Sequence, residues 1–247
     1  MYVNFILTYL RTVMKPNKQP TNGQGNLLVK IIARVLVIFI FLGLLLFLTA
    51  GSIHYKEAWI YILSLLLSGF FVIGYFLYKD PEFIGGRVLK RREKEETSKK
   101  IQNILSIPLF IGLFIPGLDY RFGWSDVPMP LVIISVAIVL AGYLIIARVM
   151  EENRYASSII EISDEQKVIE SGPYKIVRHP MYTGGLLFTI FTPLALGSYW
   201  ALIPFSATSV IGIILRIINE EKYLIANLPG YSEYCRKTKY RIIPFLW

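Results

Sequence analysis

Uncharged apolar stretches alternate with short charged stretches along most of this chain. Four of them contain no Asp, Glu, Lys or Arg, at residues 35–53, 58–78, 101–118 and 127–147. Each approaches the ~20 residues that a helix needs to cross ~30 Å of hydrocarbon. The first is too long, and starts too late, for a cleaved signal peptide, and no A-x-A-like site follows it. The pattern therefore predicts a polytopic membrane protein.

The last apolar stretch, residues 180–215, is longer than the others and also carries no charge. As one helix it would be ~54 Å long, too long for a single crossing, whereas two full spans need about 40 residues plus a turn. We therefore expect a tight helical hairpin that turns around Gly197 and Ser198. Pro108 and Pro116 predict a kink or a break in the third span. The predicted fold is an all-α integral membrane protein with about six membrane-embedded helices, the last two forming the hairpin.

The charged residues are distributed unevenly between the two ends of these spans. Only 17% of the 247 residues are charged, against about 25% in a typical soluble domain, and the net charge is +9. Alternate threading puts the basic clusters on one side of the membrane and only Lys56 and Arg121 on the other. The positive-inside rule then predicts cytoplasmic termini, in the cell membrane or, in a eukaryote, the endoplasmic reticulum membrane. Topology and anionic headgroups, rather than nucleic acid, account for the basic charge.

Cysteine and histidine are scarce. Cys235 is the only cysteine, so neither an intrachain disulfide nor a thiolate zinc cluster is expected. His54 and His179 are the only histidines, which argues against a histidine-rich metal site.

The segment "SGPYKIVRHPMYTGG", residues 171–185, places polar and aromatic side chains at the start of the last apolar stretch. Pro180 suits the first turn of a helix, and the residue before a proline is kept extended, so His179 should lie at the helix mouth. The free N–H groups there favour a negative group. An ordinary turn with interfacial side chains would also fit each residue taken alone.

The other arm of the predicted hairpin ends in "RIINEEKYL". Arg216 and Glu220 lie four residues apart and so share one helix face. Ions at the edge of an apolar helix are costly unless they are paired or functional. Because the hairpin brings this arm back to His179, the residues predict a pocket for a ligand with anionic and cationic groups. They do not by themselves name a reaction.

Four motifs carry a resemblance to a known family. "GPYKIVRHPMYTG", "R-x-x-x-E-E-x-x-L", "LPGYSEY" and the closing "RIIPFLW" together resemble the isoprenylcysteine carboxyl methyltransferases, most of all their bacterial and archaeal members. Phospholipid methyltransferases share this core. The resemblance covers residues 117–247, which we expect to form a methyltransferase core with a cofactor-binding loop, the hairpin and a C-terminal cap. Residues 1–26 are then a cytoplasmic tail, and residues 27–116 the first membrane helices and a charged cytoplasmic loop.

The resemblance implies S-adenosylmethionine as cofactor, held at the cytoplasmic face, with S-adenosylhomocysteine as the product. Arg216 would face the methyl acceptor. Many relatives have histidine where this chain has Gln166, although glutamine can still form hydrogen bonds. Carried over by position, the cofactor-binding residues are Gln166, Lys167, Val168, Ile169, Tyr174, His179, Pro180, Met181, Tyr182 and Glu220.

The acceptor is expected to be a lipid or a lipophilic small molecule that enters from the bilayer. A carboxylate is favoured because it is ionised at neutral pH and needs an arginine more than a base. A phospholipid amine or a small thiol would have to lose a proton, and His179 and Glu220 are the nearby candidates to accept it. Two further readings are a sterol-reductase-like enzyme that uses NADPH and a membrane scaffold without turnover. The sequence does not indicate an oligomeric state.

Overall fold

The computed structural model describes residues 22–81, 83, 96–155 and 166–247, and these contain helices but no β-strand. The chain divides into two compact units, residues 1–38 and 39–247. Helix α2 (Asn22–Ala50) begins in the first unit, inside the segment expected to be a tail, and ends in the second. The candidate site lies wholly in the second unit. Most of the charged loop after residue 83 lies outside the described residues.

Six helical segments of the described chain account for the predicted membrane-embedded helices, and one of them consists of two helices. Among the described residues, five stretches are long and apolar enough to cross a membrane: Leu28–Ala50, Lys56–Lys79, Asn103–Phe122, Met129–Glu152 and Leu202–Asn227. The sixth helix, α8 (Pro180–Ala195), is shorter and forms the hairpin with α9 (Leu202–Asn227). The predicted fold class is therefore confirmed.

The predicted break in the third span is also present. Helix α5 (Glu96–Gly112) contains Pro108, and a second helix, α6 (Ile115–Phe122), begins with Pro116 in its first turn. A proline lacks the N–H that would continue the ladder of helix hydrogen bonds, so it is well placed at a new helix start. The chain turns toward α7 (Met129–Glu152) after α6, through residues 123–128.

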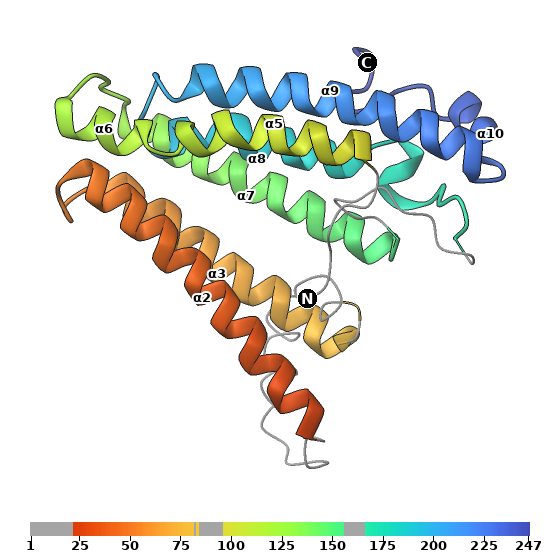
Figure 1. The fold of residues 1–247 in the computed structure, drawn as a ribbon, viewed down its shortest axis with the longest axis horizontal. Coiled ribbons are helices and arrows are strands. Elements are labelled where there is room, and N and C mark those ends of the chain that lie inside the picture. The colour runs from red at the N-terminus through yellow and green to blue at the C-terminus, as the bar shows by residue number, and fades with distance from the viewer. Residues whose placement is uncertain (1–21, 82, 84–95, 156–165) are drawn as a thin grey trace. The chain divides into compact units, whose positions relative to one another are not determined.

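Helices α5, α7, α8 and α9 form the part of the bundle that carries the site (Figure 1). Helix α8 packs along α7 on one side and against its hairpin partner α9 on the other, and α5 lies alongside α9. The remaining described elements are α3 (Lys56–Lys79), a short 3₁₀ turn η1 (Gly172–Lys175) and α10 (Tyr231–Lys237). The bundle thus has a turn end, with α6 and the α8–α9 turn, and a pocket end, with η1 and α10.

The contact between α7 and α8 depends on two glycines where the helices cross. A Cβ added at Gly142 would lie 2.6 Å from the carbonyl oxygen of Gly184, and a Cβ at Gly184 would lie 2.6 Å from that of Gly142. Small residues let helix backbones approach closely in membranes, where lipid tails are as apolar as leucine and packing drives association. This crossing fixes the position of α8 against α7.

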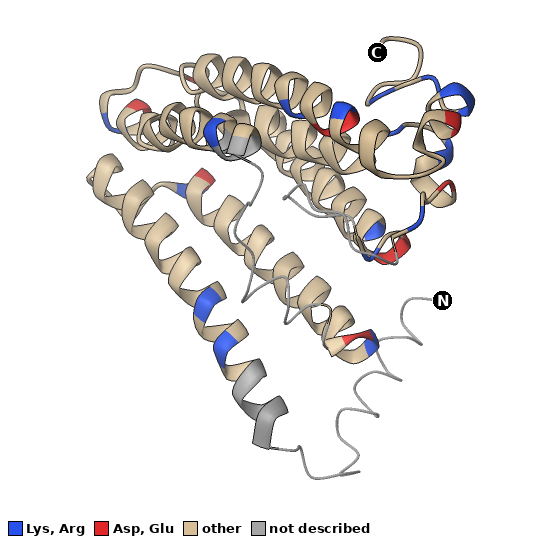
Figure 2. Cartoon of the chain, turned by 45° about the vertical axis from the view of Figure 1, so that its right-hand side comes forward, with Lys and Arg blue, Asp and Glu red and all other residues tan. Residues whose placement is uncertain are grey.

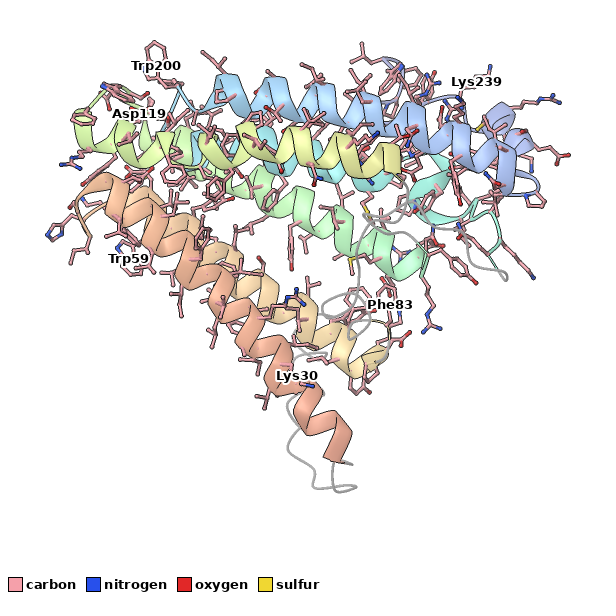
Figure 3. The ribbon with its side chains drawn as sticks, in the orientation of Figure 1. Lys30, Trp59, Phe83, Asp119, Trp200 and Lys239 are labelled. Carbon is pink, nitrogen blue, oxygen red and sulfur yellow. The ribbon has the colours of Figure 1, made fainter. Side chains whose placement is uncertain are left out.

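A buried carboxylate joins the segments of the turn end. Asp119 is 1% exposed and accepts hydrogen bonds from the Ser125 backbone (2.7 Å) and hydroxyl (2.7 Å) and from the Ser198 hydroxyl (2.5 Å). The buried phenol of Tyr55 donates to the backbone carbonyl of Leu196 in the same turn. Figure 3 labels Asp119 and Trp200 at this end and Lys239 at the other. These bonds hold the hairpin turn against α6.

Charge separates along the second unit as the threading predicted. Blue and red segments gather at the pocket end in Figure 2, whereas Lys56 and Arg121 are the basic residues near the turn end. At the pocket end, Glu151 of α7 binds Lys79 of α3 (2.5 Å) and Arg148 (2.9 Å). The second unit therefore has one end rich in basic residues and one end with few of them.

We expect Gly184→Ala to destabilise the protein and Gly185→Ala to leave its stability unchanged or slightly higher. The Cβ at 184 meets the α7 backbone, and such overpacking typically costs about 1–3 kcal/mol. A Cβ at 185 has no atom within 4 Å, and alanine favours helix over glycine by about 0.5–1 kcal/mol. Melting temperatures in detergent micelles measure the difference. Equal shifts for the two variants would contradict the role of this crossing.

Candidate functional site

A pocket opens at the pocket end, where the start of α8 meets the end of α9, η1 and α10. All ten residues proposed to bind a cofactor line this single pocket, as do seven others. The ten are Gln166, Lys167, Val168, Ile169, Tyr174, His179, Pro180, Met181, Tyr182 and Glu220. The seven that sequence reasoning missed are Asn153, Tyr155, Arg178, Leu224, Leu228, Tyr231 and Tyr234. The structure therefore brings these residues together from segments far apart in sequence.

His179 is the N-cap residue of α8 and has a non-helical backbone conformation, as its place before Pro180 predicts. Its backbone angles are φ −125° and ψ 60°, and α8 begins at the next residue. The amide of Arg178 donates to the carbonyl of Tyr240 (2.9 Å), and the amide of His179 donates to that of Arg241 (2.8 Å). A C-terminal segment thus pairs with the motif just before α8 begins.

Glu221, which was not among the predicted site residues, is the electrostatic centre of this end. Its carboxylate is 6% exposed and lies 2.9 Å from the Nε atom of Arg178, 2.9 Å from that of Arg241 and 3.2 Å from His179 Nε2. Buried charges are stable only when they are paired and hydrogen-bonded. The glutamate doublet was visible in sequence, but only the fold shows which of the two points inward.

Glu220 points into the pocket instead and is linked to Arg216 through a tyrosine. The Tyr182 hydroxyl donates to Glu220 Oε2 (2.6 Å) and accepts from Arg216 Nε (3.1 Å). Hydrogen bonds that involve a charged group are roughly twice as strong as neutral ones. Tyr182 therefore connects the two charged residues that the sequence placed on one helix face.

Arg216 does not line this pocket. It is 9% exposed and lines a second cavity of about 360 Å³ between α5, α8 and α9. Leucine and isoleucine side chains and two glycines form much of that wall, with serine and threonine between them. The Arg216–Tyr182 hydrogen bond thus lies where a polar pocket and an apolar cavity approach each other.

Three tyrosines shape the side of the polar pocket nearest α10. The Tyr234 hydroxyl donates to the Tyr174 carbonyl (2.8 Å), and Asn153 donates to the Tyr174 hydroxyl (3.0 Å). The Tyr231 hydroxyl is buried and has no hydrogen-bond partner among the described residues. Burial raises the pKa of Tyr231 well above its usual range, so this phenol remains a neutral hydrogen-bond donor. An orphaned donor on a pocket wall is suited to a polar ligand.

The polar pocket is narrow as it stands. Its free volume is about 90 Å³, whereas pockets for drug-sized ligands typically measure about 300–1,000 Å³. A nucleoside-sized ligand would therefore have to displace side chains of the lining. Gln166 and Lys167 are on the segment that follows residues outside the described part of the chain.

Comparison with known families shows what this part of the chain is similar to. Residues 130–228 match the model of the phospholipid methyltransferase family, and this range holds all ten pocket residues named from the sequence and Arg216. No curated protein sequence matches the chain.

The methyltransferase also shares its fold with a solved membrane enzyme. The structure of a eukaryotic intramembrane Ras methyltransferase, an isoprenylcysteine carboxyl methyltransferase, matches it with a TM-score of 0.51 at 17% sequence identity. The match covers 98% of this chain and 93% of that one. At this identity the likeness concerns the fold. The resemblance drawn from the motifs is confirmed, and the protein is an integral-membrane methyltransferase.

We expect Glu221→Gln to lower the stability of the methyltransferase strongly. The amide keeps the shape of the side chain but leaves Arg178 and Arg241 without a compensating charge, and breaking a buried ion pair typically costs about 3–5 kcal/mol. Glu233→Gln, the same change at an exposed position, should stay within about 0.5 kcal/mol. Melting temperatures of the two variants in detergent test this, and similar values would contradict it.

Proposed function

We propose that this protein transfers a methyl group from S-adenosylmethionine to the polar end of a lipophilic acceptor, with a carboxylate favoured. The observation that supports this most is the pair of cavities linked at Tyr182. One is polar and lies between helix ends, and the other is apolar and lies within the bundle. A donor with charged groups and an acceptor with a hydrocarbon part need these two environments.

The residues of the polar pocket fit the donor. Glu220 offers a carboxylate for an ammonium group or ribose hydroxyls, Tyr231 offers an unsatisfied hydroxyl, and Tyr174 and Tyr182 offer aromatic faces. Bound there, S-adenosylmethionine would supply a methyl group already activated by its sulfonium charge.

The apolar cavity fits the acceptor, with Arg216 at the approach to the donor. A guanidinium binds a carboxylate in a fixed, charge-assisted geometry and disfavours a cationic headgroup. Methyl transfer to a carboxylate needs no proton removal, so the work of the protein is to position the two groups and exclude water. The burial of Arg216 and its bond to Tyr182 hold it in one orientation for this task.

An amine or thiol acceptor would need a different contribution from the same residues. Its proton would have to leave before or during transfer, and Glu220, reached through Tyr182, is the nearest carboxylate in the pocket. Arg216 beside Tyr182 favours the anionic acceptor over a cationic one. We also propose that the basic pocket end faces the cytoplasm, by the positive-inside rule.

Donor binding tests the proposed function directly. Titration of the purified protein with S-adenosylhomocysteine should show binding below a few hundred micromolar, and NADPH should not bind. Tyr231→Phe should weaken the binding by about 2–10-fold, the worth of one neutral hydrogen bond, without loss of stability, because the hydroxyl it removes has no partner among the described residues. Folded protein that binds neither ligand would contradict the proposal, and binding of NADPH alone would favour a reductase.

Arg216→Ala and Glu220→Ala should affect different quantities. Arg216→Ala should reduce the rate with little effect on donor affinity, and Glu220→Ala should weaken donor binding itself. Loss of one charge-assisted hydrogen bond typically costs ~1.5–3 kcal/mol. The rate of Arg216→Ala and the donor affinity of Glu220→Ala should therefore each fall by roughly 10–150-fold. Donor affinity, melting temperature and transfer of labelled methyl into a lipid extract separate the two roles. A pair that only stabilises the fold would lower both melting temperatures and leave donor affinity unchanged.

A further inference from the structure

The cavity beside Arg216 lies between three helices and is partly open. Its walls include Leu105 and Leu109 of α5, Gly185 of α8, and Ser209, Gly212 and Arg216 of α9. Its free volume of about 360 Å³ and its mostly apolar lining suit a hydrocarbon chain beside the polar end of an acceptor.

The two glycines of this wall have different surroundings. A Cβ at Gly212 would lie 2.6 Å from Leu105 Cδ1, so this glycine allows α5 to pack against α9. A Cβ at Gly185 would meet no atom within 4 Å. The space beside the Cα atom of Gly185 is therefore empty, whereas the Leu105 side chain occupies the corresponding space beside Gly212.

Ser209 marks how far the cavity extends from Arg216 along α9. It lines the same cavity and is 5% exposed. Seven residues separate Ser209 from Arg216, or ~10 Å along the helix. A molecule that meets Arg216 with its polar end would extend its hydrocarbon chain past Gly185 toward Ser209.

We infer that Gly185 sets the length of the acceptor chain that this cavity takes. This inference rests on the proposed function, because it assumes that the acceptor occupies the cavity beside Arg216. A Cβ at 185 would meet no neighbouring atom, and Gly185 lines the cavity, so a side chain there would occupy space that the acceptor chain would otherwise use. A leucine side chain, with four carbon atoms, should therefore shorten the chain that the cavity accepts.

The test compares wild type with Gly185→Ala and Gly185→Leu, with Gly43→Leu as the matched control. Gly43 is also a helix glycine, its Cβ would have only ordinary contacts, and it lines a different surface hollow. The probes are octanoate and dodecanoate, whose binding is measured by native mass spectrometry from detergent micelles. Formation of methyl esters from labelled donor is followed in parallel.

Wild type and Gly43→Leu should bind both probes. In Gly185→Leu the affinity for dodecanoate should fall by about tenfold or more, whereas the affinity for octanoate should stay within about threefold of the wild-type value. Steric discrimination in apolar pockets of this kind is typically ~10–200-fold. Gly185→Ala should show a smaller change in the same direction, which keeps the test valid if the leucine variant misfolds.

Equal profiles in all four proteins, or a wild type that binds neither probe, would overturn the inference. Binding of S-adenosylhomocysteine is measured in the same samples. Its absence would count against the proposed function, whereas its presence with unchanged chain selectivity would count against Gly185 alone.

Discussion

The buried carboxylate of Glu221 joins the segments on which the candidate site depends. It accepts a hydrogen bond from Arg241 of the C-terminal segment. It also lies within ion-pair distance of Arg178 and His179, from the motif that precedes α8. The same ion cluster therefore ties α9 to the motif that precedes α8 and to the C-terminal segment that pairs with it.

The rest of the site follows from how α8 is held. On one side, Gly142 and Gly184 let the backbones of α7 and α8 come into contact. On the other side, α9 packs along α8, and hydrogen bonds from the turn between them to Asp119 and Tyr55 hold that turn in place. One face of α8 then carries Tyr182 and Gly185, three residues apart, toward α9. Tyr182 bonds to both Arg216 and Glu220, while Gly185 leaves space. A polar pocket and an apolar cavity result from adjacent positions of a single helix face.

Sequence reasoning predicted the arrangement of α8 and α9 where local chemistry was decisive. Pro180 identified the start of α8, and the length of the uncharged stretch required a hairpin, so His179 and Glu220 had to lie at the same end. The motif resemblance supplied residues 166–169, Tyr174 and Met181, and all of them line the pocket. Sequence reasoning missed Glu221 and the tyrosines of α10, because a doublet of glutamates at a helix end does not show which side chain is buried. It assigned Arg216 to the acceptor rather than to the donor, and in the fold Arg216 lines a cavity separate from the polar pocket.

The sequence by itself determined the membrane class, the helical hairpin, the broken third span and the family core, because hydrophobic length, charge and proline act locally along the chain. Tertiary structure alone decided which glutamate is buried as an ion and which cavity Arg216 lines. It also decided that a neighbouring side chain occupies the space beside one glycine and leaves the space beside the other empty. Gly185 and Gly212 are the same residue type in similar apolar helices, and Leu105 from a distant helix packs against only one of them. Such differences depend on the position of a third helix, and no local pattern in the chain encodes that position.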